Sequence, residues 1–198
     1  MTQVLIGQHR SLGIDVTKLT EGEREELRHM GMLPDEADML SREAVVHDDR
    51  HLWPRSATSV PRVLNEAYDY TRPSSFSRAL ALPLGDATLL LISGTASVDE
   101  EGASIYIGDF RAQCWRTYRN ITAILEANGM DWHDIVRTTC YLRDIERDYA
   151  DFNEVRTAFF TWHGLDPLPA STGIQARLCR EDLLVEIEAI AIKRTDTR

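Results

Sequence analysis

Two carboxylates stand among aliphatic residues in a β-type run near the end of the chain, residues 183–192. Side chains alternate across a strand, so Glu186 and Glu188 share one face. That face also carries Ile190 and Ile192, and the opposite face is apolar throughout. Both faces are therefore expected to pack against other parts of the protein, and at least one of the two acids is expected to be partly shielded from water. Burial raises the pKa of a carboxyl group, which suits acid/base chemistry near neutral pH. Exposure of the two acids to solvent, or their pairing with nearby arginines, is the competing explanation.

Composition places the chain among ordinary globular proteins and argues against nucleic acid as its main partner. The 198 residues are 43% hydrophobic and 27% charged, with a mean hydropathy of -0.30. This length predicts one domain, or one domain with an appendage. The formal net charge is -10, and no run of Lys or Arg occurs. Phosphate binding depends on clustered basic residues, so a nucleic-acid partner is not expected.

Cysteine and histidine spacing indicates neither a disulfide framework nor a metal site. Cys114, Cys140 and Cys179 are far apart and contain no Cys-x-x-Cys pair. His47 and His51 would share a helix face, but the residues around them lack a helical pattern, so we expect a charged loop and no metal. The start of the chain lacks a signal-peptide pattern, and no apolar run reaches membrane-spanning length. We therefore expect reduced thiols, a cytoplasmic location and no membrane partner.

The pattern divides the chain into an extension, residues 1–72, and a domain, residues 73–198. Residues 20–23 (Thr-Glu-Gly-Glu) predict a capping box that opens a helix ending near Gly31, and Pro34 can open a second helix through Val45. Residues 47–73 have no steady period and are too apolar for a free tail. They predict an arm, with Trp53 and Tyr70 closing over a cleft or packing between subunits.

The domain pattern predicts a mixed sheet with two helices packed on one face, which is an α+β fold. The uncovered face would carry Ile135, Arg137, Thr139 and Tyr141 beside the two acids. This face is too apolar to be exposed to water, so we expect a symmetric oligomer with sites between subunits. The expected strands are 76–82, 88–93, 133–142, 171–178 and 183–193, and the expected helices are 109–128, capped by Asp109, and 149–163.

Several of these segments resemble the Rid superfamily, the reactive intermediate deaminases, also called the YjgF family. The resemblance implies a chorismate-mutase-like α+β fold, a homotrimer with clefts between subunits, and hydrolysis of small enamines or imines without metal or organic cofactor. The nuclease activity sometimes ascribed to this family does not suit the acidic charge. The similar segments are residues 76–79, 91–94, 109–125, 136–144, 152–155, 169–171 and 185–191.

The family signature is altered at its substrate-binding position. Deaminases of the family carry Pro-Ala-Arg-Ser, whose arginine binds the substrate carboxylate bidentately. Here Pro169-Ala170 is followed by Ser171, and a hydroxyl cannot replace a guanidinium fork. The family's water-positioning glutamate aligns with Glu186, the catalytic candidate. The resemblance also aligns Ser93 and Phe76 with residues that line the cleft.

A small carboxylated substrate would need another cation in place of that arginine. Arg78, Arg137 on the side of Tyr141, and Arg177 are the candidates, and ion pairs with the two glutamates compete with that role. Backbone groups of residues 171–173 can polarise a carbonyl or imine. Thr172 adds a hydroxyl, and Gly173 permits close approach.

Three functions fit these residues. The first is a Rid-type hydrolase or deaminase with altered specificity, acting on a small reactive metabolite. The second is a chorismatase-like hydrolase, because residues 93–97 and 179–188 resemble chorismatases. The third is a non-catalytic metabolite-binding trimer that keeps the cleft.

Overall fold

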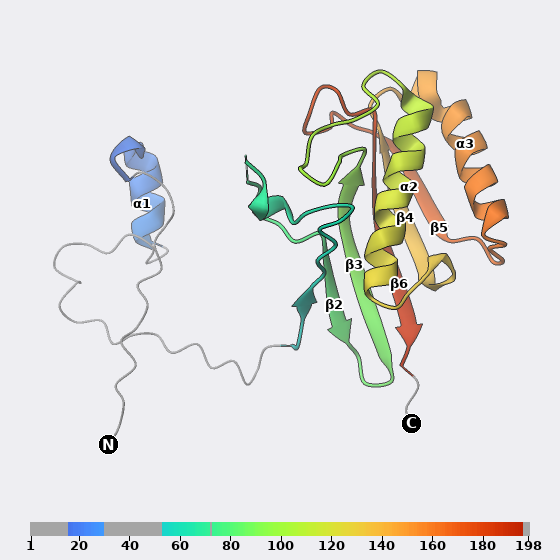
Figure 1. Cartoon of the computed structure of the whole chain (residues 1–198). Coiled ribbons are helices and arrows are strands. Elements are labelled where there is room, and N and C mark those ends of the chain that lie inside the picture. Colours follow the sequence, from blue (N-terminus) through green and yellow to red (C-terminus); the bar gives the residue numbers. More distant parts are fainter. Residues whose placement is uncertain (1–15, 30–52, 72, 196–198) are drawn as a thin grey trace. The chain divides into compact units, whose positions relative to one another are not determined.

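The computed structural model divides the chain into two compact units. They are Met1–Leu52 and Trp53–Arg198. The described residues are 16–29, 53–71 and 73–195. All the strands and both long helices of these residues belong to the second unit (Figure 1).

The first unit contains helix α1, Glu21–His29, after a 3-10 turn at Val16–Lys18. The predicted capping box is confirmed. The Glu23 amide donates to Thr20 Oγ1 at 3.2 Å, and the Thr20 amide donates to Glu23 Oε2 at 2.6 Å. The predicted second helix and the histidine pair lie outside the described residues.

Six strands of the second unit form one mixed sheet in the order β1-β2-β3-β6-β4-β5. Neighbouring strands are antiparallel except β4 and β5, which are parallel and are connected by helix α3, Ile145–Trp162. The five predicted strands are confirmed, although β2 begins three residues later and β5 ends three residues earlier than predicted, and β1 is an addition from the arm. The bounds are β1 Ser56–Ala57, β2 Ala79–Pro83, β3 Ala87–Ala96, β4 Ile135–Leu142, β5 Ala170–Gln175 and β6 Val185–Arg194.

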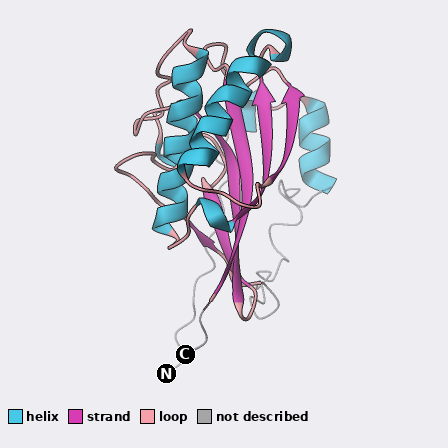
Figure 2. Ribbon diagram, turned by 90° about the vertical axis from the view of Figure 1, so that its right-hand side faces the viewer, coloured by secondary structure: helices cyan, strands magenta, loops and turns pink. Residues whose placement is uncertain are grey.

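Helices α2, Phe110–Ala127, and α3, Ile145–Trp162, cover one face of this sheet, as predicted (Figure 2). Asp109 caps α2 by accepting from the Ala112 amide at 3.0 Å. Helix α3 begins four residues earlier than predicted, because the Asp144 carboxylate accepts from the Arg147 amide at 3.1 Å. The apolar stripe of α2 is buried against the sheet, as the helical spacing predicts: Phe110, Cys114, Thr117, Ile121, Ile124 and Leu125. The fold is therefore α+β, as expected.

A bulge in β4 corrects one predicted face. The pairing of β4 with β6 shifts register between Ile135 and Arg137. The extra residue turns Ile135 into the core, where it is 5% exposed, and leaves Val136 45% exposed. The prediction that Ile135 shares the outer face with Arg137 is therefore wrong, because strict alternation fails at a bulge. Thr139 and Tyr141 pair with Glu188 and Glu186 on β6.

The arm residues 53–71 pack on the domain. Strand β1 pairs with β2, and the Trp53 indole donates to the Pro83 carbonyl at 2.9 Å. Leu64 and Ala67 are buried in the second unit. Trp53 thus lies beside the sheet edge and away from the candidate pocket, whereas Tyr70 lines that pocket.

Replacement of Leu64 tests whether the arm contributes to the stability of the domain. Leu64 is 0% exposed, so Leu64→Ala removes buried methyl groups and leaves a cavity. We expect the free energy of unfolding to fall by about 2–5 kcal/mol in a denaturant titration. Leu168→Ala is the control, since Leu168 is 65% exposed and its loss is expected to cost less than about 1 kcal/mol. Equal effects of the two changes would contradict a packed arm.

Candidate functional site

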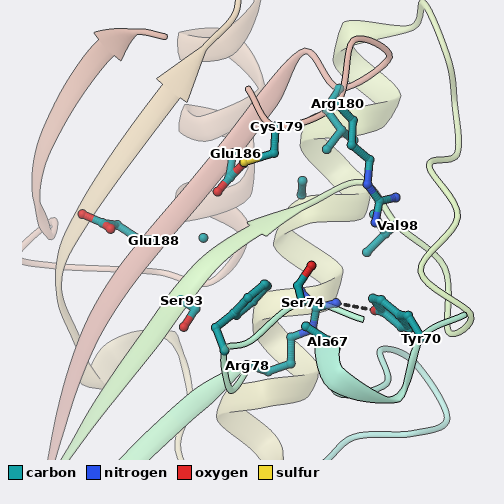
Figure 3. Close-up of a pocket in the computed structure, with 14 residues that line it drawn as sticks. Ala67, Tyr70, Ser74, Arg78, Ser93, Val98, Cys179, Arg180, Glu186 and Glu188 are labelled. Carbon is teal, nitrogen blue, oxygen red and sulfur yellow. Dashed lines mark hydrogen bonds between the residues drawn. The ribbon is translucent and has the colours of Figure 1, made fainter. Parts of the chain in front are cut away.

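A cavity of about 440 Å³ opens between the start of β2, the bulged part of β3, the loop before β6, and the arm. Figure 3 shows Glu186 and Glu188 on one side, and Arg78, Arg180 and Tyr70 on the other. Four predicted site residues meet here: Phe76, Arg78, Ser93 and Glu186. A volume in the range of roughly 300–1,000 Å³ is typical of small-molecule pockets.

A bulge in β3 makes room for the Glu186 carboxylate. The register between β3 and β6 shifts between Ile92 and Thr95, so Ser93 and Gly94 together lie opposite Glu188. A Cβ at Gly94 would lie 2.0 Å from Glu186 Oε1. Glycine therefore allows the carboxylate to lie directly against the β3 backbone. Ser93 Oγ donates to the Ser77 carbonyl at 2.7 Å, which leaves its lone pairs available to a ligand.

Burial and two neighbouring charges act on the pKa of the Glu186 carboxyl. Burial raises the pKa of this carboxyl above the ordinary value of 4.5, and the nearby Glu188 carboxylate raises it further. The Arg78 guanidinium opposes both by stabilising the charged form. Such a group can hold and release a proton nearer to neutral pH than an exposed glutamate does.

Removal of each neighbour should shift this pKa in opposite directions. We expect Glu188→Gln to lower the pKa of Glu186 and Arg78→Gln to raise it, because the first removes repulsion and the second removes attraction. Titration of the side-chain carboxyl carbon by NMR measures both shifts. A pKa that is the same in wild type and in both variants would show that these charges do not act on Glu186.

Arg78 lies deep in the pocket wall. It is 5% exposed, and its Nε donates to the Asn65 carbonyl at 3.0 Å. Its Nη2 donates to the Tyr70 hydroxyl, and its guanidinium lies 5.2 Å from the centre of the Phe76 ring. Arg78 is thus the predicted cation that reaches the pocket, and the arm holds it there.

Tyr141 and Arg177 line a second hollow beside the first. It shares Gly94, Cys179 and the two glutamates with the main pocket. Tyr141 is the register partner of Glu186 on β4. The Arg177 side chain is 86% exposed and lies 3.9 Å from the Glu181 carboxylate, so it resembles a surface ion pair.

The altered signature residues, 170–173, lie in strand β5 and do not reach the pocket within one chain. Strand β5 is an edge strand, separated from β6 by β4. Ser171 Oγ accepts from Thr138 Oγ1 at 3.0 Å and from Arg156 Nη1 at 3.2 Å. Arg137 Nη2 donates to Thr172 Oγ1 at 3.3 Å on the exposed edge. Within one chain, the structure therefore separates Arg137, Ser171, Thr172 and Gly173 from Glu186.

Arg180 and Cys179 are pocket residues that sequence reasoning missed. Both stand in the loop before β6, and Arg180 is held by the Gly102 carbonyl and by Ser104 Oγ, the latter at 3.3 Å. In the sequence, the only indication of a role for Arg180 is that an arginine stands in the turn that leads into the acid-bearing strand. Its direction toward the pocket depends on the distant residues 102–104, which a local pattern does not reveal.

The described residues contain no group of three or more His, Cys, Asp or Glu side chains placed to hold a metal ion. In the same part of the chain, no helix is long and apolar enough to cross a membrane.

Comparison with known proteins places this chain in a family. The model of the family described as Endoribonuclease L-PSP matches residues 71–193. A 2-iminobutanoate/2-iminopropanoate deaminase from Salmonella typhimurium is 35% identical over 107 residues, which cover 54% of this chain and 81% of the deaminase. A RutC family protein from Pyrococcus abyssi is 36% identical over 104 residues, covering 52% of this chain and 78% of that protein.

Solved structures agree with this assignment. The YjgF gene product from E. coli superposes with a TM-score of 0.56 at 28% identity, covering 70% of this chain and 99% of the other. E. coli TdcF with bound serine gives a TM-score of 0.57 at 25% identity, covering 70% and 98%. The predicted resemblance is therefore confirmed, and the chain belongs to the Endoribonuclease L-PSP family, which is the YjgF or Rid family.

Proposed function

We propose that this protein hydrolyses a small imine or enamine, with Glu186 as the general acid/base. In this reaction water adds to the C=N carbon, Glu186 takes a proton from the water, and it returns a proton to the nitrogen. The resulting carbinolamine loses ammonia and leaves a carbonyl group. The observation that carries the proposal is the half-buried Glu186 carboxyl, whose raised pKa and position in a pocket suit this proton transfer.

The relatives support this class of reaction. Similar proteins from Salmonella typhimurium and E. coli bear the name 2-iminobutanoate/2-iminopropanoate deaminase, at 35% and 34% identity. One structural relative, E. coli TdcF, holds bound serine, a small molecule that carries a carboxylate. These likenesses favour a substrate derived from an amino acid.

We infer that the specificity differs from that of the named deaminases. Ser171 stands where the family signature has its carboxylate-binding arginine, and its hydroxyl is engaged by Thr138 and Arg156. The carboxylate of a substrate would therefore have to bind a cationic side chain at another position.

We also propose that the protein is a homotrimer. The sheet face away from the helices exposes apolar side chains, among them Leu91 and Ile192. Partner subunits would cover this face and bring residues 171–173 of strand β5 toward a pocket. Size-exclusion chromatography with light scattering tests the assembly, and a stable monomer at micromolar concentration would contradict it.

The activity is tested with imines generated in place from amino acids. An amino-acid oxidase supplies 2-iminobutanoate or a related imine, and semicarbazide traps whatever remains unhydrolysed. We expect the protein to lower the yield of trapped imine, and Glu186→Gln to leave it near the value without protein. If the 2-oxo acid raises the Tm of the protein but no imine is hydrolysed, the non-catalytic binding protein is favoured instead.

A further inference from the structure

Two arginines from distant segments lie on the side of the pocket that faces Glu186 (Figure 3). Arg78 comes directly before β2, and Arg180 comes from the loop before β6. Tyr70 of the arm connects them. Its hydroxyl accepts from Arg78, and its ring packs on Gly102, where a Cβ would lie 2.4 Å from the ring. The Gly102 carbonyl in turn accepts from Arg180.

Arg78 is a buried cation bonded to neutral acceptors. Its guanidinium donates to the Asn65 carbonyl and the Tyr70 hydroxyl. Among the described residues no carboxylate lies within ion-pair distance of that guanidinium, and Glu66 Oε2 accepts instead from the Arg78 backbone amide at 3.1 Å. A buried charge is costly unless it is paired. An anion in the pocket would supply the missing partner.

The same wall keeps donors available for such an anion. Because the Tyr70 hydroxyl already accepts from Arg78, its own proton can be donated to a ligand. Burial also raises the pKa of Tyr70, so the proton is retained at neutral pH although both arginines oppose this shift. The hydrogen bonds from Arg180 to Gly102 and Ser104 both use Nη1, which leaves Nε and Nη2 for a ligand at the pocket rim.

We propose that Tyr70, Arg78 and Arg180 form a subsite that binds a carboxylate group of the substrate. This inference rests on the proposed function, since it names the anionic group of the molecule on which Glu186 would act. Two of its supports, Asn65 and Tyr70, precede residue 71, where the family match begins. The arm therefore contributes Tyr70 from outside the family region to a subsite whose two arginines lie within that region, and this subsite compensates for the serine at position 171.

The test measures binding to the full chain, apart from turnover. The probe is 2-oxobutanoate, and its neutral amide, 2-oxobutanamide, is the matched control ligand. We expect wild type to bind the acid more tightly than the amide in isothermal titration calorimetry. Arg180→Gln should weaken binding of the acid about tenfold, and Tyr70→Phe several-fold, with the amide unaffected. Arg180 is exposed, so its replacement leaves the fold intact.

Arg194→Gln is the control variant, because it removes the same charge at the far end of β6, outside the pocket. The inference is overturned if wild type binds acid and amide equally, or if Arg180→Gln and Arg194→Gln bind the acid alike. Turnover separates the two proposals. If Arg180→Gln hydrolyses imines with an unchanged KM, the proposed subsite is contradicted and the proposed function is supported. If binding of 2-oxobutanoate depends on Arg180 but no imine is hydrolysed, the proposed subsite is supported and the proposed function is contradicted.

Discussion

Glu186→Gln should lower kcat/KM for imine hydrolysis by about 10²–10⁴-fold, the range that general acid/base catalysis contributes. The amide has the same shape as the carboxylate, but it neither takes a proton from water nor returns one. Single-turnover measurement with a trapped-imine readout determines the loss. Glu181→Gln is the matched control, because it removes an equal charge from a side chain that is 93% exposed. Full activity of Glu186→Gln would remove this residue from the mechanism.

The same replacement should not destabilise the protein at neutral pH. The folded chain raises the pKa of Glu186, so the protein loses folding free energy as the pH rises from the ordinary glutamate pKa through the raised one, and the full cost is present above it. Glutamine avoids the cost, and we expect an equal or higher Tm for the variant at pH 7–8. The difference in Tm between wild type and variant should shrink as the pH falls below the ordinary glutamate pKa, where the glutamate and the glutamine side chains are both neutral. A lower Tm at neutral pH would show that the carboxylate has a structural role.

Gly94→Ala should lower activity about 100-fold while the domain stays folded. The new Cβ would lie 2.0 Å from Glu186 Oε1 and 3.0 Å from its Cδ, so the carboxylate has to move. Since the obstructed atoms are the end of a flexible side chain, a rotation relieves the clash at small cost in stability. A displacement of about 1 Å is enough to cost roughly 10²-fold in rate. Steady-state kinetics and thermal unfolding of the same sample measure the two effects.

A double variant tests whether the alanine acts through Glu186. If it does, Gly94→Ala combined with Glu186→Gln should be no less active than Glu186→Gln alone, because the displaced group no longer contributes. Multiplicative losses would instead mean that Gly94 affects the substrate or the β3 backbone directly.

Local sequence patterns are sufficient to predict the regular elements. The apolar spacing and the Asp109 cap define α2, since both act within one or two helical turns. Alternation likewise predicts the strand with Glu186 and Glu188 on its outer face. The apolar spacing alone places the start of α3 too late, because the cap at Asp144 is a separate signal, although that signal is also local.

Which residues share the pocket depends on long-range packing. The bulges in β3 and β4 change which side chains face outward, and they depend on pairing between strands far apart in the chain. Tyr70, Arg78 and Arg180 meet because three distant segments pack together, and no short-range pattern records such contacts. Local patterns therefore account for the elements, the acid-bearing strand and the loss of the signature arginine. The geometry around Glu186 came from long-range packing, because burial and charge at one site are summed over neighbours that lie far away in sequence.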